Sequence, residues 1–391
     1  MALVLLADGW ARGRGGQVVG LIVDHGLRGE SAAEAALTRA RLAARGIAAR
    51  VLTLHGLRRG PALAARARAA RYAALDAACA EAGILHLLLG HHAADQAETV
   101  AMRRQRGSGP AGLAAMPALV ETARLRLLRP LLTVPPVMLR RLLLAQGVGW
   151  VEDPSNADPT TLRAQLRAAH DDPDGTGAAV QSAVAASLAR GSERGAGEWL
   201  SAARLAARLR LYPQGYALLM PGDLPAAELG PLLRLLAGAD WAPAPRQLVG
   251  RLHAATLGGV RILPAGRLLP GGWLLVREAA ALGPPVPARR GAVWDRRFRL
   301  VADAPGCMLG ALGPAAAGLR RKAPWPAAVL MTLPALWRDG VLASVPHLGY
   351  GEACAVPLFS PPAPLAGAPF RSGFVVRGYG WGCQPPGDTL C

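Results

Sequence analysis

The chain is predicted to be an α/β protein that begins with a doubly wound parallel sheet and continues into smaller mixed α/β domains. Apolar runs of strand length alternate with longer stretches of helical periodicity, and each run ends in glycine or polar residues. Strands separated by helices in this way pair in parallel through right-handed crossovers. The expected strands are residues 17–24, 47–54, 84–89 and 124–132.

Helices are expected before and between these strands. Residues 1–12 carry apolar side chains on several faces, which predicts a buried helix. Residues 61–82 are rich in Ala and Arg with helical periodicity, and a further helix is expected over residues 135–146. Ser31 is followed three residues later by Glu34, which predicts a capping box at the start of the helix between the first two strands.

The stretch around the third strand concentrates the chemically useful side chains. Residues 84–89 are almost continuously apolar, as in a strand buried on both faces. His91 and His92 follow it, at the strand end where open α/β sheets bind ligands. Asp95 and Glu98 then place two carboxylates on one face near the start of a helix, where they can hold a magnesium–phosphate group or take a proton.

A basic, glycine-rich loop ends that helix. Arg106 precedes Gly107, Ser108 and Gly109, so the backbone of small residues can approach a phosphate closely beside a guanidinium. Each of these motifs, taken alone, is also explained by a purely structural role, which is the plainer interpretation. Acidic residues in a first helical turn often only complement the helix dipole, and a histidine pair after a strand is often ordinary loop structure.

Composition indicates a folded protein with a polyanionic partner. The chain has 391 residues, is 52% hydrophobic, and carries 44 basic against 26 acidic residues, a net charge of +18. Nucleic acid fits this charge better than a membrane, because arginine is spread along the chain and no apolar segment approaches the roughly 20 residues that span a bilayer. The five cysteines are too far apart for a CxxC site and suit a reducing cytoplasm.

Changes in composition predict four parts. Residues 1–170 form the proposed catalytic domain, and residues 171–197, rich in Asp, Gly, Ala and Ser, form a linker with a short helix. Residues 198–283 form a small mixed domain, and residues 284–391 a carboxyl-terminal nucleic-acid-binding or accessory domain. Strands of the third part are expected near residues 216–220, 260–263 and 273–276.

Several motifs together point to one family. The run GHHAADQAET (residues 90–99), followed by RGSGPAGLAAM (106–116), resembles the signature of the tRNA(Ile)-lysidine synthases, members of the PP-loop, or N-type ATP pyrophosphatase, superfamily. VDHGLR (23–28), ARAARY (67–72) and WVEDPSN (150–156) match further family motifs. The resemblance is strong over about residues 1–170. Ala94 and Ala164 stand where the family generally has aspartate and asparagine.

The resemblance implies an adenine nucleotide α-hydrolase-like fold and a ligation on tRNA. Members adenylate the C2 oxygen of the wobble cytidine of tRNA(Ile) with a CAU anticodon, and the amine of free L-lysine then displaces AMP. The implied catalytic residues are Asp95 and Glu98, which are also the candidate Mg²⁺ ligands. The implied ATP-binding residues are Asp24, His25, Arg28, His91 and His92. The implied phosphate or tRNA contacts are Arg71, Arg106, Gly107, Ser108, Gly109, Arg163 and Arg167.

The implied cofactors are ATP and Mg²⁺, and the implied partners are the tRNA and lysine. Membrane binding is not expected, and a homodimer is one possible state of assembly. Arg163 and Arg167 can pair with phosphate. They can equally form the basic face of a helix packed by Leu162 and Leu166. A cytoplasmic location follows from the family and from the cysteine pattern.

The amino terminus is expected to be incomplete. PP-loop proteins bind ATP phosphates through an SGGxDS loop between the first strand and first helix, and in this family that loop is often followed by Met-Ala-Leu. This chain begins at Met1 with that tripeptide and holds no SGGxDS. We therefore expect about 20 to 30 preceding residues, a strand plus the loop. The alternatives are an inactive homologue that only binds RNA, and another PP-loop enzyme such as a tRNA thiolase, although thiolases generally carry CxxC pairs.

Overall fold

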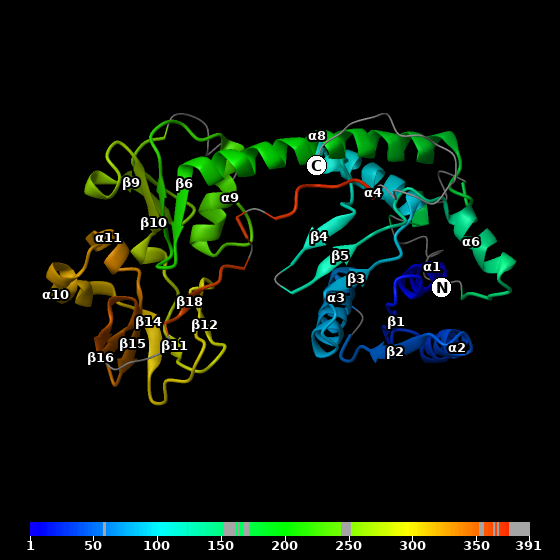
Figure 1. Cartoon of the computed structure of the whole chain (residues 1–391), viewed down its shortest axis with the longest axis horizontal. Helices are drawn as coiled ribbons and strands as arrows, with labels where there is room; N and C mark the ends of the chain where they lie inside the picture. Colours follow the sequence, from blue (N-terminus) through cyan, green and yellow to red (C-terminus); the bar gives the residue numbers. More distant parts are fainter. Residues whose placement is uncertain are drawn as a thin grey trace. The chain divides into compact units, whose positions relative to one another are not determined.

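The computed structural model shows two compact units (Figure 1). The first comprises residues 1–196 together with the carboxyl-terminal residues from 368, and the second comprises residues 197–367. The structure describes residues 1–57, 60–122, 124–151, 162, 164–166, 172–243, 252–351, 356–362, 364–365 and 367–374. Within these residues, no helix is long and apolar enough to cross a membrane.

A parallel pair of strands opens the first unit. β1 (Val19–Asp24) pairs with β2 (Ala48–Thr53) in a register that runs from Val19 opposite Ala48 to Asp24 opposite Thr53. α2 (Ser31–Ala43) crosses between them. Gly20 permits the close packing of this helix, because a Cβ there would lie 2.8 Å from Leu42. The predicted strand–helix–strand unit is confirmed.

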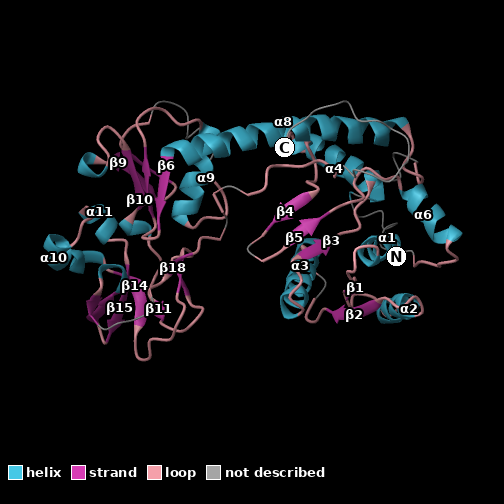
Figure 2. Ribbon diagram, in the orientation of Figure 1, coloured by secondary structure: helices cyan, strands magenta, loops and turns pink. Residues whose placement is uncertain are grey.

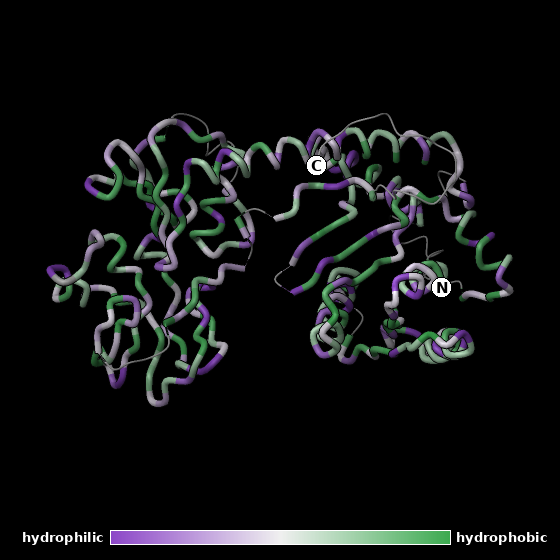
Figure 3. Tube along the Cα trace, in the orientation of Figure 1, coloured by the Kyte–Doolittle hydropathy of each residue, from purple (hydrophilic) through white to green (hydrophobic). Residues whose placement is uncertain are grey.

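A three-stranded sheet forms the second half of this unit. β3 (His86–Leu88) runs parallel to β5 (Arg126–Leu128), and β4 (Leu119–Glu121) pairs with β5 in the antiparallel direction. α3 (Leu63–Glu81) packs Leu75 and Cys79 against Leu87 and Leu89, in a core that Leu21 also joins. Figure 2 shows α3 beside this sheet, and Figure 3 shows the apolar strands as green segments.

Several details differ from the sequence predictions. β1 and β2 form one sheet and β3, β5 and β4 another, so the expected single parallel sheet is divided in two. The run 84–89 is not buried on both faces: Leu87 and Leu89 are buried, whereas Leu85 and His86 are exposed. Apolar character predicts a strand, but burial of each face depends on which elements cover it.

The third difference concerns α1 (Ala2–Arg12), which is only partly buried. Ala2 packs with Leu143 and Val148 beside α6 (Pro136–Ala145), whereas Trp10 is exposed and lies under the guanidinium of Arg14. Ser31 also does not cap α2, because its hydroxyl donates to the Arg28 carbonyl and the helix has no side-chain cap.

The remaining helices of the first unit surround the motif-bearing segment. α4 (Ala93–Gln105) follows β3, and the short α5 (Pro110–Leu113) follows the glycine-rich loop. α8 (Ala178–Arg208) is a continuous helix of 31 residues, where composition had suggested a linker with a short helix. Alanine is the best helix former, so the Ala-rich composition accounts for this helix once packing stabilises it.

The carboxyl-terminal segment, defined here as residues 368–374, returns to the first unit beside β4 and α8 (Figure 1). The N–H of Ala118 donates to the Arg371 carbonyl at 2.6 Å, and the N–H of Ala368 donates to the Glu121 carboxylate at 3.1 Å. Phe370 is only 7% exposed, and the guanidinium of Arg194 lies 4.5 Å from its ring centroid. This segment is therefore packed as part of the first unit's core.

The second unit consists of antiparallel sheets and short helices. Its first sheet, in the order β6-β7-β10-β9-β8, comprises Leu209–Tyr212, Tyr216–Leu219, Trp273–Arg277, Val260–Pro264 and Ala255–Leu257. The predicted strands near 216, 260 and 273 are thus confirmed. α9 (Ala226–Ala237) covers this sheet with Leu232, Leu233 and Leu236.

Two further sheets complete the second unit. One has the order β11-β14-β15-β16-β17 and comprises Val286–Pro287, Met308–Ala311, Pro334–Arg338, Val341–Val345 and Tyr350–Gly351. The other comprises β12 (Val293–Trp294), β13 (Phe298–Arg299) and β18 (Leu358–Phe359). The helices α10 (Ala316–Leu319) and α11 (Ala327–Leu330) pack on the core.

Candidate functional site

The carboxyl ends of β1, β3 and β5 carry the polar residues of the candidate site. At the end of β1, Asp24 is buried and its carboxylate accepts the N–H of Gly26 at 2.9 Å. Hydrogen bonding from the Ser31 side chain, and then from Gly26, lowers the pKa of Asp24 from its ordinary value. Asp24 is therefore a fixed negative charge, while Arg28 pairs with Glu34 at 2.9 Å.

The start of α4 places the predicted histidine and aspartate together. His92 is the N-cap residue, and its backbone N–H donates to the Asp95 carboxylate at 3.0 Å. The same carboxylate oxygen lies 3.6 Å from Nδ1 of His92. Asp95 thus interacts with the helix start, as the plainer interpretation expects, and its side chain is still 14% exposed.

Glu98 lies one turn further into α4 and is almost completely buried, with 2% exposure. A carboxylate buried this deeply is uncommon unless it is bonded or has a chemical role. Beside it, Gln96 is 1% exposed and clamps Met116 through both ends of its amide: Nε2 donates to the Met116 carbonyl at 2.9 Å, and Oε1 accepts its N–H at 3.0 Å. This clamp ties α4 to the end of the motif and was not predicted.

His91, two residues before α4, is influenced by the charges of arginines from other elements. The pKa of His91 is lowered to about 4, chiefly by burial; the charge of Asp95 opposes this lowering, and the charges of Arg129, Arg71 and Arg68 add to it. His91 is consequently a neutral imidazole at physiological pH. The predicted Arg71 is near this group, and Arg129 and Arg68, which were not predicted, join it.

Arginines from two helices hold the segment that directly follows the glycine-rich loop. Gly107 has φ of 67°, a left-handed conformation that favours glycine. Arg103 donates to the carbonyl oxygens of Gly112 at 2.6 Å and Ala115 at 2.9 Å, and Arg194 of α8 donates to the carbonyl of Ala111 at 3.0 Å. The predicted contacts Arg106, Gly107 and Gly109 are exposed, and Ser108 is partly buried.

Arg163 and Arg167, predicted as phosphate or tRNA contacts, lie outside the described residues. Within the described part, no group of three or more His, Cys, Asp or Glu residues could hold a metal by itself. Two carboxylates on one helix face fit Mg²⁺ in its usual nucleotide-bound form, because that ion keeps most of its ligands from phosphate and water.

One signal in the sequence could have identified Arg129. It follows Leu127 and Leu128 and precedes Pro130, so it is the first polar residue after a strand that is parallel to β3. The carboxyl ends of parallel strands meet at one edge of a sheet. The signal was hidden because the two other arginines in the RLRLLR stretch, Arg124 and Arg126, are exposed surface residues.

Comparison with known proteins identifies the class. A family described as a PP-loop domain matches residues 1–170, the part that contains β1, β3, β5 and α4. The first unit is therefore of the PP-loop class, an α/β domain. A U34-tRNA thiolase, NcsA from Methanococcus maripaludis, aligns at a TM-score of 0.40 and 15% identity over 48% of this chain and 65% of that chain, a likeness too low to carry an argument.

Relatives extend the match beyond this domain. A tRNA(Ile)-lysidine synthase of Ruegeria pomeroyi is 34% identical over 86% of this chain and 83% of its own length. One of Mesorhizobium japonicum is 36% identical over 81% of this chain and 73% of its own length. The chain belongs to the tRNA(Ile)-lysidine synthase family. With the synthase of Bradyrhizobium diazoefficiens it is 42% identical, and it spans 47% of that relative's length.

Proposed function

We propose that this protein ligates lysine to C2 of the wobble cytidine of tRNA(Ile) with a CAU anticodon, using ATP. The observation that carries the proposal is the start of α4 directly after β3, where Asp95 and the buried Glu98 face one helix side in a chain of this family. In the first step the C2 oxygen of cytidine attacks the α-phosphorus of ATP, and pyrophosphate leaves. In the second step a lysine amine attacks C2, and AMP leaves.

The chemistry of the two steps explains why the site needs both cationic and anionic side chains. The C2 carbonyl is amide-like and a poor electrophile, and adenylation converts its oxygen into a leaving group. Cationic side chains such as Arg71 and Arg106 can stabilise the negative charge that develops on the departing pyrophosphate. Asp95 and Glu98 can orient the lysine amine and accept its proton, a role within reach of carboxylates at a helix start. Neutral His91 can accept or donate a hydrogen bond without adding charge.

Mg²⁺, held by Asp95 and Glu98 when bound with ATP, would supply charge neutralisation at the phosphates. Asp24, His25, Arg28 and His92 lie on the strand ends or helix start that would border the nucleotide. The net charge of +18 supports tRNA as the polyanionic substrate, and binding should weaken as salt rises. A homodimer and a cytoplasmic location remain part of the proposal.

The test uses two nearly isosteric substitutions, Asp95→Asn and Glu98→Gln. Each should abolish ATP–pyrophosphate exchange in the presence of the tRNA and lysine, because each removes a negative charge from the proposed site. Glu121→Gln is the matched control, since Glu121 is an exposed carboxylate of the same unit that pairs with Arg126. It should leave exchange unchanged.

Three outcomes separate the candidate functions. Exchange that depends on tRNA and on both carboxylates, together with AMP release that depends on lysine, supports the ligase. Full exchange in Asp95→Asn and Glu98→Gln would reject the site. Specific tRNA binding without exchange in the unsubstituted protein would favour an RNA-binding homologue, and product sulfur instead of lysidine would favour a thiolase.

A further inference from the structure

A buried guanidinium that has no carboxylate partner among the described residues lies at the end of β5. Arg129 is 6% exposed, and its Nη1 donates to the Pro117 carbonyl at 2.9 Å. Its Nε is buried without a hydrogen-bond partner among the residues that the structure describes, and no described carboxylate pairs with it. Charged groups are rarely buried unless paired, because the lost hydration is not otherwise replaced. A positive charge in this position therefore calls for an anion.

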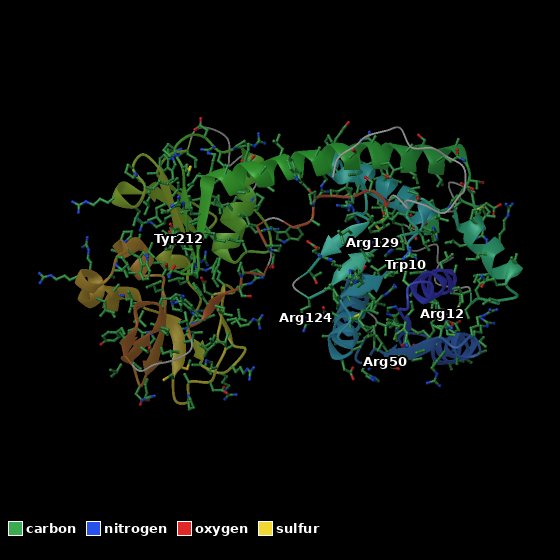
Figure 4. All side chains as sticks on the ribbon, in the orientation of Figure 1. Trp10, Arg12, Arg50, Arg124, Arg129 and Tyr212 are labelled. Carbon is green, nitrogen blue, oxygen red and sulfur yellow. The ribbon has the colours of Figure 1, made fainter. Side chains whose placement is uncertain are left out.

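The backbone holds Arg129 firmly at this place. Its N–H donates to the Ala118 carbonyl at 2.8 Å, and the preceding Leu128 carbonyl accepts the N–H of Leu89 at 2.8 Å. Leu89 is two residues before His91, so the end of β5 lies next to the start of the motif. Figure 4 labels Arg129 at this end of the sheet and Arg124 at the opposite end of β5.

Further cations come from α3. Arg68 and Arg71 are exposed residues on that helix, and both act on His91 electrostatically, as Arg129 does. Arg68 stacks on Tyr72, with its guanidinium 4.9 Å from the ring centroid, which restricts that side chain. One buried and two exposed guanidiniums from two elements thus contribute positive potential at one imidazole. Arg68 and Arg71 alone would be ordinary surface charges, but a buried arginine such as Arg129 is not an ordinary surface charge.

We propose that Arg129 is the anchor of an oxyanion-binding site that holds a phosphate or carboxylate group of a reactant, with the positive charges of Arg68 and Arg71 adding to the attraction. This proposal rests on the proposed function, which supplies two reactants of that kind: the polyphosphate of ATP and the carboxylate of the amino acid. The planar guanidinium matches both groups, since it donates two parallel hydrogen bonds to a pair of oxygens. Its burial favours the bond, because surrounding protein excludes competing water.

Isothermal titration calorimetry of the full chain tests the oxyanion-binding site with three probes. The probes are inorganic pyrophosphate, L-lysine and cadaverine, which is lysine without its carboxylate. Arg129→Gln should weaken binding of pyrophosphate or of lysine at least tenfold. Arg129→Lys should weaken it less, because lysine keeps the positive charge but loses the two parallel N–H donors. Arg126→Gln is the matched control, because Arg126 lies on the same strand, is exposed, and pairs with Glu121 at 3.0 Å. It should bind as the unsubstituted protein does.

The probes distinguish the two anions. A loss confined to pyrophosphate assigns the oxyanion-binding site to phosphate, and a loss for lysine but not cadaverine assigns it to the carboxylate. Thermal unfolding without ligand separates binding from a structural role: Arg129→Gln should melt at the same or a higher temperature, because it removes an uncompensated buried charge. Pyrophosphate or lysine should raise the melting temperature of the unsubstituted protein but not of this variant.

Two results would overturn the oxyanion-binding site: equal binding of both anions by Arg129→Gln and the unsubstituted protein, or binding of neither anion by the unsubstituted protein. A lower melting temperature for both Arg129 variants, with affinity unchanged, would assign Arg129 to folding alone. Failure of the proposed ligase reaction is distinguishable, because the exchange assay can fail while Arg129-dependent binding of pyrophosphate persists.

Discussion

Gly195 of α8 controls whether the carboxyl-terminal segment can dock. A Cβ at this position would overlap the backbone carbonyl oxygen of Phe370. A Cβ at Gly191 would lie 2.8 Å from Cε1 of the Phe370 ring. The helix backbone therefore approaches the segment as closely as only glycine allows. We expect Gly195→Ala to displace the segment from the first unit.

The magnitude follows from the ring that would be exposed. A phenylalanine side chain buries about 200 Å², which corresponds to about 5 kcal/mol at about 25 cal/mol per Å². This is a ceiling, since release of the segment restores conformational entropy and alanine favours the helix by about 1 kcal/mol. We expect a net loss of about 1–3 kcal/mol, which lowers the melting temperature by several degrees.

Gly197→Ala is the matched control, because Gly197 lies in the same helix and a Cβ there meets nothing within 4 Å. It should gain about 0.5–1 kcal/mol from helix propensity alone. Differential scanning calorimetry would measure both changes, and limited proteolysis would report release of the carboxyl terminus in Gly195→Ala. Equal stabilisation by both substitutions, with no change in cleavage, would refute the close packing that we describe.

Two further predictions concern buried carboxylates. Because the folded-state pKa of Asp24 is lowered below its ordinary 3.8, its stabilising effect is present above that pH and is lost as pH falls through the folded pKa. The unfolding free energy of the unsubstituted protein should therefore fall more steeply on acidification than that of Asp24→Asn. Urea denaturation from pH 6 to pH 3 would contradict this if the unfolding free energies of the two proteins changed in parallel. In the second unit, Asp295 lies 2.6 Å from Arg297 and 3.2 Å from Arg277, with all three side chains largely buried. Asp295→Asn should cost about 3–5 kcal/mol in urea denaturation, whereas Asp240→Asn, in the exposed pair with Arg296, should cost much less because solvent screens that pair; similar losses would show that burial does not decide the effect.

Local pattern in the sequence determined where most helices and strands of the first unit lie. Residues 17–24 contain β1, residues 61–82 contain α3, and the run ending at Leu89 contains β3. These elements were predictable because hydrophobic periodicity and breaking glycines act over a few neighbouring residues. The motif over residues 90–116 likewise identified the family, because its order of side chains is visible without any fold.

Only the tertiary structure decided which elements meet. The split into two sheets, the clamp of Gln96 on Met116 and the burial of Arg129 all depend on contacts between separated parts of the chain. The bond from Ala368 to Glu121 spans 247 residues. Sequence periodicity carries no information on such pairings, because a strand's alternation is the same whichever neighbour it bonds. Arg129 and Arg126 are three residues apart and chemically identical, and only packing makes one a buried charge and the other a solvated one.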